Sequence, residues 1–293
     1  MRLSPFREEQ GVHRSLYNVL SMGQGPARIA AAVSVLLALG MIGLAQRRRS
    51  MPSPGTAAIG PNAEFYFVRV QYSDLPGGGR GFRRGFGGGF GRGWWMQDWP
   101  RAEQHFTEGV KRLTRIDVGE ARSAPLTDDR IFEYPWAYAT QVGYWDLSDA
   151  ETARLREYTL RGGFLVVDDF WGVSEWEVFR DSMERTFPGR PIVEIAPSDP
   201  MMHVLYDIGN VVQIPGLRHL RRGPDGSIVT QLEGTPPHWR AIYDDKGRMV
   251  VAINYNMDIG DAWEEADVPE YPAEATGLAY RFAINSILYS MTH

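Results

Sequence analysis

The amino-acid sequence predicts an α/β protein, in which a parallel β-sheet carries helices on both faces. Two observations lead to this prediction. Segments rich in aromatic and β-branched residues alternate along the chain with segments of helical periodicity, as they do when helices join parallel strands. One strand segment, 164–167 (FLVV), is apolar at every position, as a strand covered on both faces needs to be.

The composition fits one large domain or two small ones. The chain has 293 residues, of which 43% are hydrophobic and 12% aromatic, and this excludes a disordered or fibrous protein. Its net charge of −5 gives no reason to expect a polyanion as partner. The chain has no cysteine, which excludes disulfides, thiolate metal sites and a cysteine nucleophile.

Residues 1–45 are expected to be a signal peptide or an N-terminal membrane anchor. Residues 29–45 contain 17 uncharged residues and predict one hydrophobic helix, which suits a short membrane span or the apolar region of a signal peptide. The expected location is therefore the cell envelope, either secreted to the periplasmic (extracytoplasmic) side or anchored in the inner membrane. Three arginines at 47–49 oppose cleavage and export, so an anchor facing the cytoplasm stays open, as does a buried core helix. Met22 is an alternative start.

A linker and a first strand precede a segment of low complexity. Residues 46–62 are basic and then rich in Pro, Ser, Gly and Ala, as linkers are, and the domain is expected to span 63–293. Residues 65–72 (FYFVRVQY) predict a strand. Residues 77–93 contain only Gly, Arg and Phe and predict a flexible loop inserted after this strand.

The rest of the chain predicts alternating helices and strands. Asp98 is expected to cap a helix at its N-terminus, and strands are expected near 135–140, 164–167 and 192–195. Ser148 with Glu151, and Ser174 with Glu177, predict capping boxes that open two more helices. Residues 242–253 predict a hairpin, and 273–291 predict a long buried helix.

Acidic and amide side chains follow several predicted strands. In such sheets ligands bind beyond the carboxyl ends of the strands, where carboxylates and amides can hold Mg²⁺ or Ca²⁺ or clamp sugar hydroxyls. The candidate catalytic residues are Asp168 and Asp169, together with His203 as a general base or ligand. The candidate ligand-binding residues are Asp74, Asn256, Asp258 and Trp263. The alternative is that these residues only start turns and cap helices.

Metal and nucleic-acid motifs are weak in this sequence. The six histidines are scattered, without the spacing of a zinc site, and His105 and His219 are expected to be solvated. No cofactor is predicted, although a divalent cation is possible at the acidic residues. Residues 77–93 resemble arginine-glycine segments that bind RNA, but they hold only four arginines in an acidic chain, so nucleic acid is not the expected partner.

Five motifs stand out from residue 65 onward: FYFVRVQYSD, YPWAYAT, LRGGFLVVDDFWG, GRMVVAINYNMDIGDAWE and RFAINSILYSMT. Through these motifs the chain resembles a bacterial family of unknown function, DUF4159. That family is similar in fold to class I glutamine amidotransferases, so the resemblance implies a three-layer, flavodoxin-like domain. It implies no substrate, because the activity of the family is not established.

The resemblance also excludes amidotransfer from glutamine. Amidotransferases hold a nucleophilic cysteine in an elbow after this strand, where the present chain reads Val167-Asp168-Asp169-Phe170. Two hypotheses remain. The first is a non-catalytic module of the cell envelope that binds a small molecule or an envelope protein. The second is a hydrolase-like enzyme for a carbohydrate or envelope substrate that uses Asp168 and Asp169.

Overall fold

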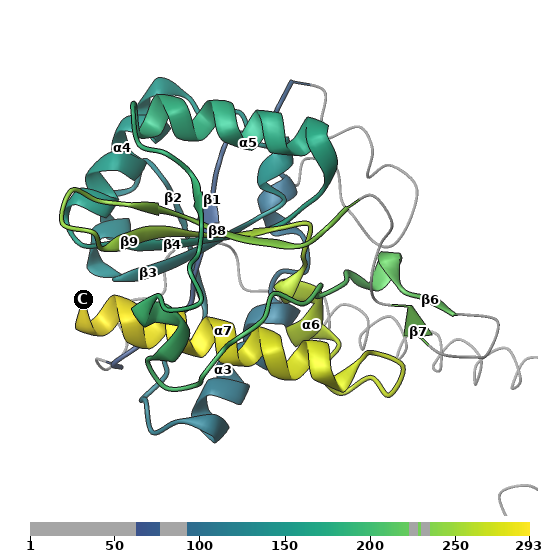
Figure 1. Ribbon diagram of the computed structural model, residues 1–293. Coiled ribbons are helices and arrows are strands. Elements are labelled where there is room, and N and C mark those ends of the chain that lie inside the picture. Colours follow the sequence, from purple (N-terminus) through teal and green to yellow (C-terminus); the bar gives the residue numbers. More distant parts are fainter. Residues whose placement is uncertain (1–62, 77–92, 223–227, 230–234) are drawn as a thin grey trace, which may run out of the picture. The chain divides into compact units, whose positions relative to one another are not determined.

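The computed structural model describes residues 63–76, 93–222, 228–229 and 235–293 (Figure 1). The predicted signal peptide or anchor at 1–45 and the predicted linker at 46–62 lie outside the described residues, as does the predicted loop at 77–93 except for Gly93.

A seven-stranded sheet forms the centre of the domain, in the order β2-β1-β3-β4-β9-β8-β5 (Figure 1). Its strands are β1 (Val68–Gln71), β2 (Arg122–Pro125), β3 (Trp136–Thr140), β4 (Phe164–Phe170), β5 (Val193–Glu194), β8 (His238–Tyr243) and β9 (Met249–Tyr255). Every residue of β3, β4 and β9 is buried, as the apolar run at 164–167 predicts for a central strand. A separate antiparallel pair joins β6 (Arg221–Arg222) to β7 (Ile228–Val229).

The predicted α/β architecture is confirmed, and five neighbouring strands from β2 to β9 are parallel. The exception is β8, which is antiparallel to both β9 and β5. The cause is the short turn from Tyr243 to Met249, because so few residues can only connect antiparallel neighbours. The expected hairpin at 242–253 is thus present, and it turns the sheet from a parallel into a mixed one.

Helices cover both faces of the sheet in three layers (Figure 1). One face carries α4 (Asp149–Leu160) and α5 (Gly172–Thr186), and the other carries α3 (Arg101–Leu113), α6 (Ile259–Glu264) and α7 (Ala273–Thr292). Alternate residues of each strand enter the two cores: Tyr138 packs on the α7 side and Ala139 on the α5 side. Short 3₁₀ turns complete the chain: η2 (Trp94–Met96), η3 (Asp129–Glu133), η4 (Val142–Tyr144), η5 (Pro200–His203) and η6 (Leu217–His219).

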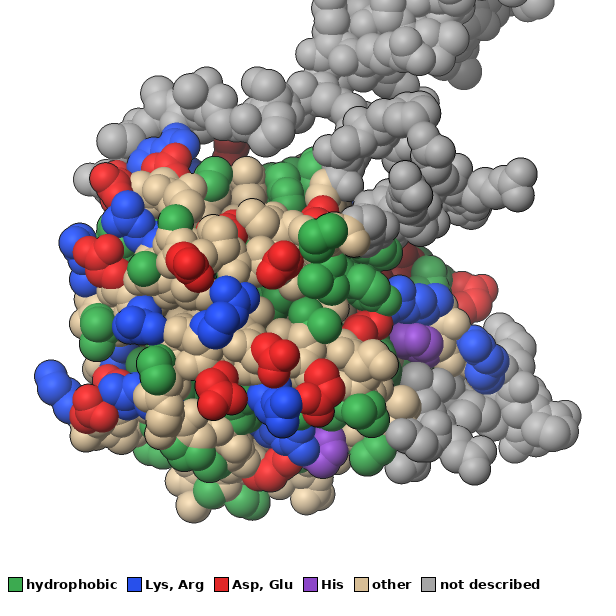
Figure 2. All heavy atoms as spheres, turned by 90° about the horizontal axis from the view of Figure 1, so that it is seen from above, with side chains coloured by type: hydrophobic (Ala, Val, Ile, Leu, Met, Phe, Trp, Pro, Cys, Tyr) green, Lys and Arg blue, Asp and Glu red, His purple; other side chains and the backbone are tan. Residues whose placement is uncertain are grey.

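The surface over α4 and α5 is an ordinary solvated face. Side chains of both charges are interspersed there (Figure 2), and several pair along one helix, as Arg180 does with Glu177 on α5. Exposed pairs of this kind contribute little to stability.

The helix starts confirm one predicted cap and correct two. Ser148 and Glu151 form the expected capping box of α4. The predicted box at Ser174 is wrong, because α5 already begins at Gly172, although Glu175 still accepts the N–H of its N-cap residue Trp171 at 2.7 Å. Asp98 is not the cap of α3 either, since Pro100 occupies that position. The Asp98 carboxylate is therefore available for other contacts.

The long helix α7 confirms the prediction of a buried helix near the C-terminus, because more than half of its residues are buried. Within the described ranges, no helix is both long and apolar enough to cross a membrane.

Candidate functional site

Strained backbone is concentrated where β3, β4 and β9 end, an edge of the sheet that we call the carboxyl edge. Of the described residues other than glycine, four have a left-handed backbone: Asp98 (φ 62°), Gln141 (54°), Asp169 (50°) and Asn256 (57°). Gln141 and Asn256 directly follow β3 and β9, and Asp169 lies near the end of β4. Such conformations are costly and cluster at functional sites, so the carboxyl edge is the first place to look for one.

Asp169 is held firmly by three donors. The Gln141 amide donates to its Oδ2, and the Trp171 ring N–H and the Arg218 guanidinium donate to its Oδ1 at 2.8 and 3.2 Å. The side chain is only 2% exposed. Both carboxylate oxygens therefore accept hydrogen bonds, which fixes their orientation.

Asp168 is fully buried and uses one oxygen for the fold. Its Oδ2 accepts the Tyr138 hydroxyl at 2.6 Å and the backbone N–H groups of Ile259 and Gly260 at 2.9 and 3.1 Å, at the start of α6. Its Oδ1 has no hydrogen-bond partner among the described residues. Burial raises the pKa of Asp168 to about 7, and repulsion from Asp169 adds to this shift.

Asp168 Oδ1 is one of several buried polar atoms at this edge that lack a partner within the described part of the chain. Thr140 is the register partner of Asp168 on β3, and its Oγ1 is unpaired. Both side-chain atoms of Asn254 on β9 and the Oε1 of Gln141 are unpaired as well. Buried polar groups nearly always have partners. The carboxyl edge is therefore suited to hold water or a ligand.

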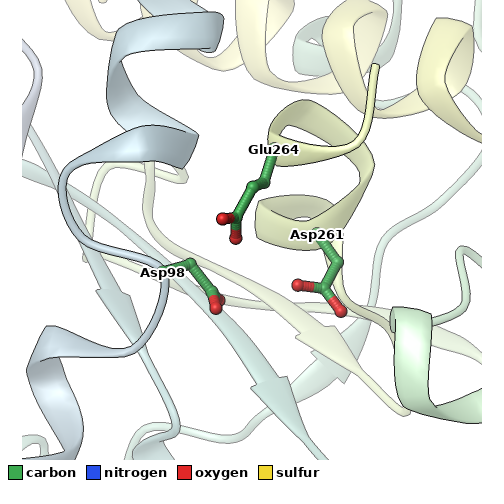
Figure 3. Close-up of side chains that lie close together, drawn as sticks. All are labelled: Asp98, Asp261 and Glu264. Carbon is green, nitrogen blue, oxygen red and sulfur yellow. The ribbon is translucent and has the colours of Figure 1, made fainter. Parts of the chain in front are cut away.

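Five carboxylates form two triads that share Asp98. In the inner triad (Asp98, Asp169 and Asp258), one carboxylate oxygen from each residue lies within 4.8 Å of the other two. The outer triad (Asp98, Asp261 and Glu264) meets the same limit, and Figure 3 shows its side chains directed toward one another from the loop before α3 and from α6. Such spacing suits coordination of a cation by oxygen ligands.

The loop before η6 closes over these carboxylates through Gly216. A Cβ atom at Gly216 would lie 2.7 Å from Asp258 Oδ2 and 3.3 Å from both Asp261 Oδ2 and His219 Nδ1. The backbone N–H of Leu217 also donates to Asp261 Oδ2 at 2.6 Å. Only glycine allows this close approach, which brings His219 beside the two acids.

Burial and mutual repulsion keep the pKa values of these acids high. The pKa values of Asp98 and Asp258 are raised well above the usual range, first by burial and then by neighbouring carboxylates. The pKa of Asp261 is also raised, and that of Glu264 reaches about 7 for the same two reasons. The edge therefore favours binding of protons or cations, either of which relieves the repulsion.

The structure brings together three of the acids that the sequence singles out, namely Asp168, Asp169 and Asp258. It does not bring His203 to them. His203 lies on η5, where its ring contacts the exposed Asp207 and the carbonyl of Pro197. Asp74 belongs to neither triad, since its carboxylate accepts the backbone N–H of Trp94.

Asn256 and Trp263 have structural positions as well. Asn256 Oδ1 accepts the N–H of Gly172 at 2.8 Å, and its Nδ2 donates to the carbonyl of Pro236 at 2.8 Å. Trp263 is fully buried, and its ring packs against Phe67 and Phe106 in the core. Trp263, a candidate ligand-binding residue by sequence, therefore lies with its ring in the core.

Sequence reasoning missed Asp98, Glu264 and His219. Asp98 was assigned to a helix cap. A usable pattern was present in Asp258, Asp261 and Glu264, because a spacing of three residues after a strand places acids on one face of a helix. His219 was expected to be solvated but packs on the Trp171 ring, with centroids 4.1 Å apart. Burial and Arg218 lower its pKa to about 4.

Comparison with known proteins identifies the family. Residues 67–291 match the family described as "Domain of unknown function (DUF4159)", and this match covers most of the chain. The chain therefore belongs to this family, as its sequence motifs indicated. No curated protein matches it.

Proposed function

We propose that this DUF4159 domain binds a divalent cation at its carboxyl edge and acts as a cation-dependent binding module. The observation that carries the proposal is the inner triad, in which oxygens of Asp98, Asp169 and Asp258 lie within 4.8 Å of one another. Hard cations such as Mg²⁺, Mn²⁺ and Ca²⁺ take oxygen ligands of this kind.

Two further features of the edge support a cation. Gln141 Oε1 is buried without a partner in the described structure, while the N–H of the same amide donates to Asp169. This oxygen is thus an unused acceptor directly beside the triad. The carboxylates also carry an excess of negative charge, because Arg218 is the one arginine that bonds to the inner triad within the described ranges.

A binding role fits this site better than a nucleophilic one. Both oxygens of Asp169 already accept hydrogen bonds, so the carboxylate is oriented as a ligand rather than free to attack a substrate. The bound cation would retain open positions for a small molecule or for a carboxylate of an envelope protein. Export or anchoring through residues 29–45 would place this module in the cell envelope.

Hydrolysis at the same edge is the second candidate, and Asp168 favours it. The unpaired Oδ1 of Asp168 and a pKa of about 7 suit a group that accepts a proton from a cation-bound water near neutral pH. This role predicts cation-dependent cleavage of chromogenic sugar or phosphate esters that is lost in Asp168→Asn. Binding without cleavage would leave the module as the function.

Thermal unfolding of the full chain with Mg²⁺, Ca²⁺ or Mn²⁺ tests the cation site. An ion that binds only the folded protein must raise Tm, by several degrees when the concentration of the free ion is about a hundredfold above Kd. We expect this rise in the wild type and in the exposed control Asp181→Asn, and a clearly smaller rise in Asp169→Asn and Asp258→Asn. Equal Tm values with and without each ion in the wild type would overturn the proposal.

A further inference from the structure

We infer that the carboxyl edge holds two divalent cations, one in each triad, and that Asp98 bridges them. This inference rests on the proposed cation site and adds a second ion to it. The first ion lies in the inner triad of Asp98, Asp169 and Asp258. The second lies in the outer triad of Asp98, Asp261 and Glu264 (Figure 3).

The shared carboxylate gives the geometric argument. Carboxylate oxygens of Asp98 lie within 4.8 Å of those of two different pairs of acids. One pair is Asp169 on β4 and Asp258 at the N-cap of α6, and the other pair lies within α6. A carboxylate has two oxygens and can bind one cation with each. Bridged cations in proteins lie about 3.5–4 Å apart, a separation that one carboxylate spans.

The contacts of Asp98 leave it suited to this role. Its carboxylate accepts a hydrogen bond from the side-chain amide of the adjacent Gln97, which reaches Oδ1 at 2.5 Å. Glu264 also lies within hydrogen-bonding reach of Asp98, and two carboxylates can only approach so closely with a proton or a cation between them. The left-handed backbone of Asp98 turns its side chain toward both triads.

Buried acceptors without partners provide independent evidence of a missing positive ligand. Gln141 is 1% exposed, and its Nε2 donates to Asp169 Oδ2, whereas its Oε1 has no hydrogen-bond partner within the described structure. Asp168, 0% exposed, lies against the start of α6 next to Asp258, and its Oδ1 is likewise unpaired there. Gln141 Oε1 cannot donate, and neither can Asp168 Oδ1 when it is ionised, so the partner that each lacks is a cation or a hydrogen-bond donor.

The balance of charge indicates more than one cation. Six carboxylates meet at this edge when Asp168 is counted with the two triads. The arginines that offset them are Arg218, Arg69 and Arg101. Arg69 also pairs with Glu103, and Arg101 with Glu265. With all six carboxylates ionised and only Arg218 set against them, about five negative charges remain, of which one divalent ion offsets two and two ions offset four.

Counting bound Mn²⁺ by electron paramagnetic resonance of the full chain tests the inference. We expect two Mn²⁺ per wild-type chain, with a spectrum broadened by coupling between neighbouring ions. Glu264→Gln removes an outer ligand and should leave one uncoupled ion, and Asp169→Asn should leave one ion in the outer triad. Asp98→Asn should abolish the coupling. The exposed variant Glu184→Gln should keep both ions.

The outcomes separate this inference from the proposed function. One Mn²⁺ in the wild type, unaffected by Glu264→Gln, would overturn the second site and keep the first. No bound Mn²⁺ would overturn both. Two ions that persist in Glu264→Gln would contradict the outer triad as the second site. Circular dichroism checks that each variant folds. If Glu264→Gln does not fold, Asp261→Asn takes its place as the variant of the outer triad.

Discussion

Thr140 and Asp168 are register partners on β3 and β4, and each has a buried side-chain oxygen without a partner among the described residues. In a parallel pair such residues share one face of the sheet. On β9, Ile253 is the register partner of Val167. The next residue, Asn254, therefore lies on the same face of the sheet as Asp168. Three central strands therefore end in unpaired polar groups beside the acid triads. Water or a ligand at this edge would supply the missing partners.

Stability without cations should fall as the pH rises from about 4 to about 7. The pKa values of Asp168 and Glu264 are raised to about 7 in the folded protein, whereas unfolded carboxyl groups titrate near 4. The folded state then binds more protons than the unfolded state in this window, so its relative stability decreases with pH. Urea unfolding at pH 5 and pH 7.5 with a chelator checks the sign. Higher stability at pH 7.5 would contradict the assigned shifts, and Asp168→Asn should flatten the dependence.

Arg69→Met should destabilise the domain by about 3–5 kcal/mol, because it leaves Glu103 as an unpaired buried charge. Arg69 also donates to the carbonyls of Trp95 and Gln97 at 3.1 and 3.0 Å and so holds the segment that presents Asp98. Cation affinity should therefore fall as well. Arg112→Met, in an exposed pair with Glu108, is the matched control and should cost less than about 1 kcal/mol. Similar losses for the two variants would refute the role of the buried pair.

Gly216→Ala should weaken cation binding at least about tenfold while leaving most of the stability intact. The new methyl group would meet Asp258 Oδ2 at 2.7 Å and push that ligand out of the inner triad. Gly209→Ala is the control, since a Cβ there meets nothing within 4 Å. Calorimetric titration with Mn²⁺ measures both variants. Unchanged affinity in Gly216→Ala would show that the approach of this loop does not matter.

Asn256→Ala should lower stability by about 1–3 kcal/mol, because alanine is strained at φ 57° and cannot replace the bonds to Gly172 and Pro236. Asn256→Gly should be less harmful, since glycine accepts this backbone conformation. The exposed Asn210→Ala provides a baseline. If Asn256 is structural, the stoichiometry of Mn²⁺ stays the same in every variant that folds. Loss of an ion in Asn256→Gly would instead make Asn256 a ligand.

The sequence predicts the architecture better than it predicts the site. Apolar runs and helical periodicity identify β3, β4 and the central helices, because burial on both faces leaves a local pattern. The cluster of Asp98 with Asp261 and Glu264 leaves no such pattern, since residues more than 160 positions apart meet only through the fold. A local rule also assigned Asp98 to a helix cap. Asp168 and Asp169 were found because strand ends of an α/β sheet meet at one edge.

The most direct test of the cation site is a crystal of the protein soaked in Mn²⁺, with anomalous scattering recorded at the manganese edge. We expect an anomalous peak among the carboxylates of Asp98, Asp169 and Asp258, which should disappear in Asp169→Asn crystals. Clear electron density for these three side chains with no anomalous peak between them, at Mn²⁺ concentrations that saturate ordinary carboxylate sites, would contradict it.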